Sequence, residues 1–308
     1  MITQEELASY IPYPAKDAHK YSRGKCVLLA GSASYPGAAC LAARASQYAG
    51  AGYTQVFTAF ENKLLLRLYR PSLVVNSFQD FFPLQALKPG STGAFVVGPG
   101  FESNDLQLLS LVESVLNYAA RPVLIDGGAL SYLPALREDS TWQNTLTILS
   151  GTLVLTPHFG EAVKLGQPFN IDVSSMSQEE AAHQLSVYYN AIVVFKGPDT
   201  VVAYNDRCET ITCGNEVLSK AGTGDVLSGI IGGLLAQGMD PFEACVLGAS
   251  IHGKAGYIAQ ERYGLVSTCA EEVLDSIPDA FIALGILSSH DDISSSDKDV
   301  QTLLSESN

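Results

Sequence analysis

The stretch from Ser219 to Gly238, SKAGTGDVLSGIIGGLLAQG, places glycines and an acid at the start of an apolar helix. Apolar residues recur at helical spacing after Asp225, so this acid is expected in the first turn. Glycine at positions 222 and 224 lets successive backbone N–H groups turn toward one point, where the helix dipole adds positive potential. We therefore predict an anion hole at Gly222, Thr223 and Gly224, with Asp225 beside it as a candidate base. The alternative is an acid that only stabilises the helix start.

Two further features of this stretch lead to expectations. Glycine inside a helix costs about 1 kcal/mol relative to alanine, so Gly229, Gly232 and Gly233 are interpreted as positions of close helix packing. We also expect a low pKa for Asp225, because N–H dipoles at a helix start favour the carboxylate over the acid.

The segment KGPDT, residues 196–200, leaves an apolar run and is a second candidate for phosphate binding. Lys196 would supply the positive charge, and a tight turn over Gly197, Pro198, Asp199 and Thr200 would expose backbone amides. The alternative is a plain hairpin turn with a solvated lysine.

Two other turns could contact a substrate. In TPHFGE, residues 156–161, His158 is a candidate ligand-binding imidazole, or a helix cap with Glu161 beside the helix dipole. A metal site there lacks a third ligand at a fitting spacing. Gly100 in the GPG turn and Ala38 at a helix start could admit a bulky substrate close to the backbone, although each alone is an ordinary turn.

The elements that must position these residues alternate along the chain. Strands are predicted within 25–30, 53–60, 93–100, 121–130, 152–161 and 191–204, and helices separate most of them. This order predicts one doubly wound, mostly parallel α/β sheet with helices on both faces and a short antiparallel excursion, a hairpin near residue 204. Ligands of such folds lie outside the carboxyl ends of the strands. The turns at 31–38, 98–100, 126–128, 156–161, 196–200 and 222–224 are therefore expected to meet.

Composition narrows the function classes. The 308 residues carry a formal net charge of −14, which argues against nucleic acid or an anionic membrane surface as the main partner. With no secretory signal and no apolar run long enough to span a membrane, we expect a cytoplasmic protein. Six scattered cysteines are interpreted as reduced structural thiols. Residues 1–287 are expected to form one domain and the acidic, serine-rich segment 288–308 a mobile tail.

Several common catalytic motifs are missing from the chain. It has no Walker loop with its lysine, no complete dinucleotide fingerprint and no G-x-S-x-G elbow. Hydride transfer and nucleophilic serine hydrolysis are therefore poorly supported.

Taken in order, the motifs TPH-x-GE, KG-x-x-T and GTGD give the chain a family resemblance. Together with HKYSRGKCVLLAGSASYPGA, VVGPG and LIDGGAL, they resemble the ADP- or ATP-dependent NAD(P)H-hydrate dehydratase family, a branch of the ribokinase-like superfamily. The resemblance covers roughly residues 16–283.

This resemblance implies an enzyme that repairs NADH and NADPH damaged by hydration. A nucleotide phosphorylates the added hydroxyl, and loss of phosphate restores the double bond. The family implies ADP or ATP as co-substrate with Mg²⁺, and Asp225 as the base. It implies a hydrate site at Ala38, Gly100, His158 and Asp225, and a nucleotide site at Lys196, Gly197, Pro198, Asp199, Thr200 and Gly224. We also expect a homo-oligomer and an epimerase supplied by a separate protein.

The chain departs from the family pattern in places. The segment SKAG replaces a more usual MATGG-like run and adds Lys220 next to the anion hole, while Gly127 or Gly128 stands where the family often has aspartate. Two alternative functions stay open: a kinase of a small alcohol such as a vitamin precursor, and a nucleotide-binding regulator without turnover.

Overall fold

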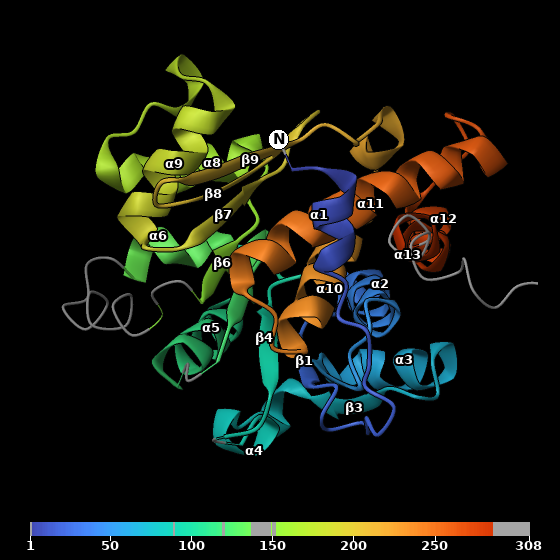
Figure 1. Cartoon of the computed structure of the whole chain (residues 1–308). Helices are drawn as coiled ribbons and strands as arrows, with labels where there is room; N and C mark the ends of the chain where they lie inside the picture. The colour runs from blue at the N-terminus through green and yellow to red at the C-terminus, as the bar shows by residue number, and fades with distance from the viewer. Residues whose placement is uncertain (1, 89, 119–120, 137–148, 150–151, 286–308) are drawn as a thin grey trace, which may run out of the picture.

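The computed structural model describes residues 2–88, 90–118, 121–136, 149 and 152–285. In this part of the chain, nine strands form one sheet in the spatial order β3-β2-β1-β4-β5-β6-β7-β8-β9 (Figure 1). The strands are β1 Lys25–Leu29, β2 Tyr53–Thr58, β3 Val74–Ser77, β4 Gly93–Val97, β5 Val123–Ile125, β6 Leu153–Leu155, β7 Ile192–Phe195, β8 Thr200–Tyr204 and β9 Arg207–Ile211.

The pairing is parallel from β3 through β7 and antiparallel from β7 to β9. The predicted doubly wound α/β sheet with a short antiparallel excursion is thus confirmed. Edge strand β3 was missed, because its short run of two valines has no clear period. The strand order reverses between β1 and β4, and in open α/β sheets such a switch point opens a crevice at the carboxyl ends.

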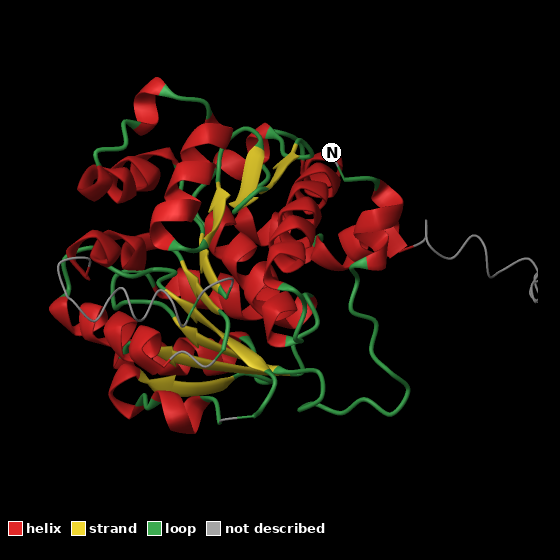
Figure 2. Ribbon diagram, turned by 60° about the vertical axis from the view of Figure 1, so that its left-hand side comes forward, coloured by secondary structure: helices red, strands yellow, loops and turns green. Residues whose placement is uncertain are grey.

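Helices cover both faces of the sheet (Figure 2). They are α1 Gln4–Ser9, α2 Pro36–Tyr48, α3 Lys63–Tyr69, α4 Pro83–Ala86, α5 Leu106–Tyr118, α6 Leu133–Leu136, α8 Phe159–Gly166, α9 Gln178–Tyr189, α10 Thr223–Ala236, α11 Pro241–Tyr263, α12 Ala270–Asp275 and α13 Ile277–Gly285. Alternate residues of β1 point to opposite faces: Cys26 and Leu28 join the core under α2, α10 and α11, whereas Val27 and Leu29 join the core under α5, α8 and α9.

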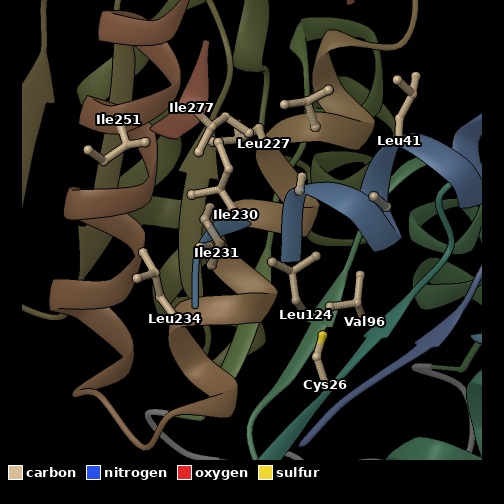
Figure 3. Packing of buried hydrophobic residues seen from close by; sticks show 14 of the residues in the cluster. Cys26, Leu41, Val96, Leu124, Leu227, Ile230, Ile231, Leu234, Ile251 and Ile277 are labelled. Atoms are coloured by element: carbon tan, nitrogen blue, oxygen red, sulfur yellow. The ribbon is translucent and has the colours of Figure 1, made fainter. Parts of the chain in front are cut away.

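The predicted apolar helix is α10, at the centre of the first core. Figure 3 shows Ile230, Ile231 and Leu234 of α10 packed among side chains of the sheet and of α11. Such a helix is buried almost all round, which explains why its sequence lacks a polar face.

The glycines inside α10 allow α2 to approach it closely. A Cβ on Gly229 would overlap the carbonyl oxygen of Ala42, and one on Gly233 would lie 2.5 Å from that of Ser46. From the first contact to the second, the position rises by four residues in α10 and by four in α2, so the two helices run parallel. Both helices begin at the carboxyl edge of the sheet. The predicted role of these glycines in packing is confirmed.

Two sequence expectations concern the outer parts of the chain. The predicted tail, 288–308, lies outside the described residues, so its assignment stays a prediction. Within the described ranges, no helix combines the length and apolarity that crossing a bilayer requires.

Replacement of Gly229 by alanine should destabilise the protein by about 1–3 kcal/mol, because the new methyl group must push two backbones apart. Gly37, in the first turn of α2, is a matched control, since a Cβ there meets nothing within 4 Å. Gly37→Ala should be neutral or stabilising by up to about 1 kcal/mol. Chemical unfolding of both variants tests this; equal stabilities would contradict the packing interpretation.

Candidate active site

The loops that follow β1 and β4 are joined at the switch point of the sheet. The N–H of Gly31 donates to the carbonyl of Pro99 at 2.8 Å, and that of Ser32 to Gly100 at 3.0 Å. Buried Asn62, which the sequence did not single out, donates its amide to the carbonyls of Gly31 and Ser32 at 3.1 and 2.8 Å. The backbone of this crevice is therefore fixed before any ligand binds.

Ala38 and Gly100, two predicted substrate-binding residues, are neighbours in this crevice. Gly100 has φ +70°, and a Cβ on it would lie 2.7 Å from the Cβ of Ala38 and 2.8 Å from the carbonyl oxygen of Tyr35. Only glycine fits here, because both the backbone angle and the space exclude a side chain.

Asp126, directly after β5, is a buried carboxylate with three donors. It accepts from Thr156 Oγ1 and Ser228 Oγ, both at 2.7 Å, and from Lys196 Nζ at 2.9 Å. Burial alone would raise the pKa of this carboxyl, but the Lys196 charge and the three hydrogen bonds outweigh it and lower the pKa. Asp126 is thus an anion that ties together the ends of β5, β6 and β7 and the first turns of α10.

Lys196 is held inside this network and is not the solvated lysine of the hairpin alternative. Its ammonium lies 2.9 Å from Asp126 and 4.0 Å from Glu161. Burial disfavours the charged form, but the carboxylates Asp126 and Glu161 outweigh it and raise the pKa of Lys196. A Cβ on Gly224 would lie 3.4 Å from Lys196 Nζ, so the ammonium lies next to the anion hole. Its positive charge is already shared with the carboxylates of Asp126 and Glu161.

His158 forms the cap that the sequence offered as an alternative to a ligand-binding role. It is the N-cap of α8: its Nδ1 accepts from the N–H of Glu161 at 3.3 Å, and Glu161 accepts from the N–H of His158 at 2.8 Å. Its Nε2 lies 3.5 Å from Glu161 Oε1, and the side chain stays 60% exposed, so the ring can still contact a ligand from its solvent side.

The start of α10 has the geometry expected of an anion hole. Gly222 is the N-cap with φ +93°, and Val226 N–H makes the first helical bond to its carbonyl. Thr223 Oγ1 donates to the carbonyls of Leu218 and Lys220 at 2.7 and 2.8 Å. Within the described ranges no acceptor meets the N–H of Gly224 or Asp225, as expected for the first turn of a helix.

Buried His252 of α11 lies near this turn. Burial lowers the pKa of its imidazole to about 4. The ring is therefore neutral near pH 7 and adds no charge beneath the anion hole.

The expected low pKa of Asp225 is wrong. Burial, and next the charge of Asp126, raise the pKa of this carboxyl to about 7; Lys196 opposes the shift and Glu161 adds to it. The sequence argument weighed only the helix dipole. It left out the burial of the carboxyl, which is the largest cause of the shift, and the nearby charges of Asp126 and Glu161.

Two cavities meet at His158. One, of about 450 Å³, is lined by Tyr35, Phe101, Glu102, Ser103, Asn104, Gly127, Gly128, Ser131, His158, Glu161 and Lys164. The other, of about 870 Å³, is lined by His158, Lys196, Gly197, Pro198, Asp199, Gly214, Asn215, Glu216, Leu218, Ser219, Lys220, Ala221, Gly222, Thr223, Gly224, Tyr257 and Gln260. Most of the predicted nucleotide and anion residues, at 196–199 and 222–224, are therefore in the lining of this second cavity.

Not every predicted site residue lines a cavity. Thr200, the first residue of β8, is not in the lining of either cavity. Ala38 and Gly100 lie next to Tyr35, which lines the smaller cavity. Asp225 directly follows Gly224, which lines the larger one. Tyr35 and Tyr257 line the cavities but were missed, since single tyrosines in loops and helices carry no sequence signal. Asp126 was placed at a strand end, but its partners, Ser228 above all, could not be paired from sequence.

The donor set suits a metal carried by a nucleotide. Among the described residues no group of three His, Cys, Asp or Glu side chains could hold a metal ion. Mg²⁺ is commonly bound by one or two carboxylates together with substrate phosphates and water. Glu161, whose carboxylate lies 4.0 Å from the Lys196 ammonium, could complete such a shell.

Comparison with known proteins places this geometry in a family. The sequence model described as NAD(P)H-hydrate dehydratase matches residues 26–279. The chain belongs to the NAD(P)H-hydrate dehydratase family. This confirms the resemblance and the ribokinase-like fold expected from it.

Individual relatives of this chain have names that agree with this family assignment. The chain is 34% identical over 259 residues to an ADP-dependent (S)-NAD(P)H-hydrate dehydratase of Neisseria meningitidis serogroup B, covering 82% of this chain and 83% of that protein. A crystal structure of the ADP/ATP-dependent NAD(P)H-hydrate dehydratase from Bacillus subtilis, co-crystallised with ATP/Mg²⁺, superposes with TM-score 0.76 at 26% identity, covering 92% and 97% of the two chains. A bifunctional NAD(P)H-hydrate repair enzyme of Escherichia coli is 30% identical over 89% of this chain, which spans only 50% of that protein.

The raised pKa of Asp225 should make this protein less stable at high pH. Between the ordinary value of 3.8 and about 7, the folded state binds one proton more than the unfolded state, so stability falls as pH rises through this window. Asp225→Asn removes the effect. Its stability relative to the native protein should therefore rise by about 2–3 kcal/mol between pH 5 and pH 8.

Denaturant unfolding at the two pH values measures this difference. Asp206→Asn, which changes an exposed carboxylate between β8 and β9, is the control and should differ from the native protein equally at both. A pH-independent difference for Asp225→Asn would refute the raised pKa.

Removal of Lys196 should destabilise the fold, because it leaves Asp126 buried without its counter-charge. A loss of about 3–5 kcal/mol is expected for Lys196→Ala. Lys196→Met combined with Asp126→Asn should recover much of the loss, since neither charge is then left unpaired. Unfolding free energies of the single and double variants test the pair; a loss below about 1 kcal/mol for Lys196→Ala would show that the two charges are not coupled.

Proposed function

We propose that this chain dehydrates hydrated NADH and NADPH at the expense of ADP or ATP, restoring the intact dinucleotide. The observation that carries the proposal is the junction of two cavities at His158, beside a helix start and a carboxyl of raised pKa. A two-substrate phosphoryl transfer needs such a junction, since donor and acceptor must meet in one place.

The larger cavity suits the nucleotide. Its floor is the turn from Lys196 to Asp199 together with Gly224, and its inner end is the start of α10. The N–H groups of Gly224 and Asp225 would receive the phosphate that is transferred, because they are free and the helix dipole favours an anion. Preorganised donors of this kind stabilise charge that develops during the reaction.

The smaller cavity suits the hydrated nicotinamide. It lies under Tyr35 and Phe101, next to the contact of Ala38 with Gly100, and His158 and Glu161 form its border with the nucleotide. The exposed imidazole of His158 would contact the substrate, while its other nitrogen is used in the helix cap.

Asp225 would act as the general base. With a pKa of about 7 it is matched to proton transfer near neutral pH. As the hydroxyl oxygen bonds to phosphorus, its proton passes to Asp225 and the bond from phosphorus to the nucleotide oxygen breaks. The phosphate then leaves the ring carbon with the electron pair of the C–O bond, the neighbouring ring carbon loses a proton to solvent, and the double bond is restored. Bound Mg²⁺ would neutralise phosphate charge, and the carboxylate of Glu161 could help to hold it.

We further propose that the protein is cytoplasmic and homo-oligomeric and depends on a separate epimerase. This chain spans 50% of the bifunctional repair enzyme of Escherichia coli. Size-exclusion chromatography with light scattering measures the oligomeric state.

The purified chain should restore NADH absorbance from its hydrate when ADP or ATP and Mg²⁺ are present. Asp225→Asn should lower kcat by roughly 10²–10⁴-fold and leave nucleotide binding within a few-fold, because it keeps shape and removes the proton acceptor. For the native enzyme, kcat/KM should fall as pH drops below about 7.

Two outcomes would contradict this function. Stable phosphorylation of a small alcohol without absorbance recovery would favour the kinase alternative. Near-native kcat in Asp225→Asn would reduce Asp225 to a helix-start residue, since asparagine caps a helix as well as aspartate does.

A further inference from the structure

The nucleotide cavity has little free positive charge for the ligand proposed to bind there. Its charged lining, apart from His158, consists of Lys196, Lys220, Asp199 and Glu216, a formal sum of zero. Lys196 is also committed to Asp126 at 2.9 Å and faces Glu161 at 4.0 Å. A nucleoside diphosphate entering this cavity therefore needs another cation.

Lys220 is the second lysine of the lining and differs from Lys196 in what holds it. Its ammonium is partly exposed and donates to the carbonyl of Val266 at 2.6 Å, with Cys269 Sγ at 3.8 Å. Neither contact is to a carboxylate. Val266 is 86% exposed, so water can replace the ammonium on this carbonyl at little cost.

The backbone of Lys220 is fixed to the anion hole, whereas its side chain tip is not. Its carbonyl accepts from Thr223 Oγ1 at 2.8 Å, which anchors the residue two positions before Gly222. A four-carbon stem rooted there can turn from the Val266 carbonyl toward a phosphate at the start of α10. The exchange replaces a neutral acceptor by an anion, which forms the stronger, charge-assisted bond.

We infer that Lys220 supplies the positive charge for the terminal phosphate of the bound nucleotide, in place of the free charge first expected from Lys196. This inference rests on the proposed nucleotide site. The phosphate at the helix start is the terminal one in both ADP and ATP, so Lys220 serves both alike and does not contact the single phosphate of AMP.

Calorimetric titration of the full chain with ADP, ATP and AMP, each with Mg²⁺, tests the inference. Lys220→Met should raise the Kd of ADP and of ATP by about 10- to 100-fold, the range of a charged hydrogen bond, and that of AMP less than about 2-fold. Lys220→Arg should keep most of the affinity. In turnover, Lys220→Met should raise the nucleotide KM more than it lowers kcat.

Lys254→Met is the matched control, because Lys254 is an exposed lysine of α11 outside the cavity lining and should bind nucleotides like the native chain. Native-like ADP binding by Lys220→Met, or an equal loss for AMP, overturns the role of Lys220 and leaves the proposed function intact. If the native chain binds neither ADP nor ATP, both the role of Lys220 and the proposed function are overturned.

Discussion

The buried carboxylate of Asp126 is the constraint on which the site depends. An anion in this position is tolerated only when donors surround it, and its donors come from Thr156 after β6, Lys196 after β7 and Ser228 in α10. A shift of any of these elements would take a hydrogen-bond donor away from the buried carboxylate of Asp126. The carboxyl edge of the sheet is thereby held in one arrangement, and the anion hole is held with it.

The same arrangement sets the chemistry of Asp225. Burial is the main reason why the pKa of Asp225 rises to about 7, and the charge of Asp126 adds to the shift, which Lys196 only partly opposes. A base matched to neutral pH thus follows from burial combined with a shortage of positive charge. The shortage has a second effect, since a polyphosphate entering the neighbouring cavity finds little free cationic charge in the described walls besides Lys220.

Much of the fold and part of the site followed from the sequence. Buried strands ending in glycine or polar turns predicted the sheet, and the parallel order brought the turns at 98–100, 126–128, 156–161 and 196–200 to one edge. Pairwise facts could not be predicted: that Ser228 reaches Asp126, that Asn62 fixes the loop at Gly31, or that Lys196 is already paired. The pKa of Asp225 was misjudged for this reason, because it depends on side chains that lie far apart in the sequence.

The parallel contact of α2 with α10 has an electrostatic consequence. Each helix start carries roughly half a positive charge, and the glycines of α10 let the two starts converge on the same edge of the sheet. Parallel dipoles side by side repel each other, so the close approach of the two helix starts costs electrostatic free energy that packing of the small residues must offset. An anion bound at this edge relieves the repulsion, and because it binds only the folded chain, it also shifts the folding equilibrium. The ligand therefore contributes to the stability of the folded chain.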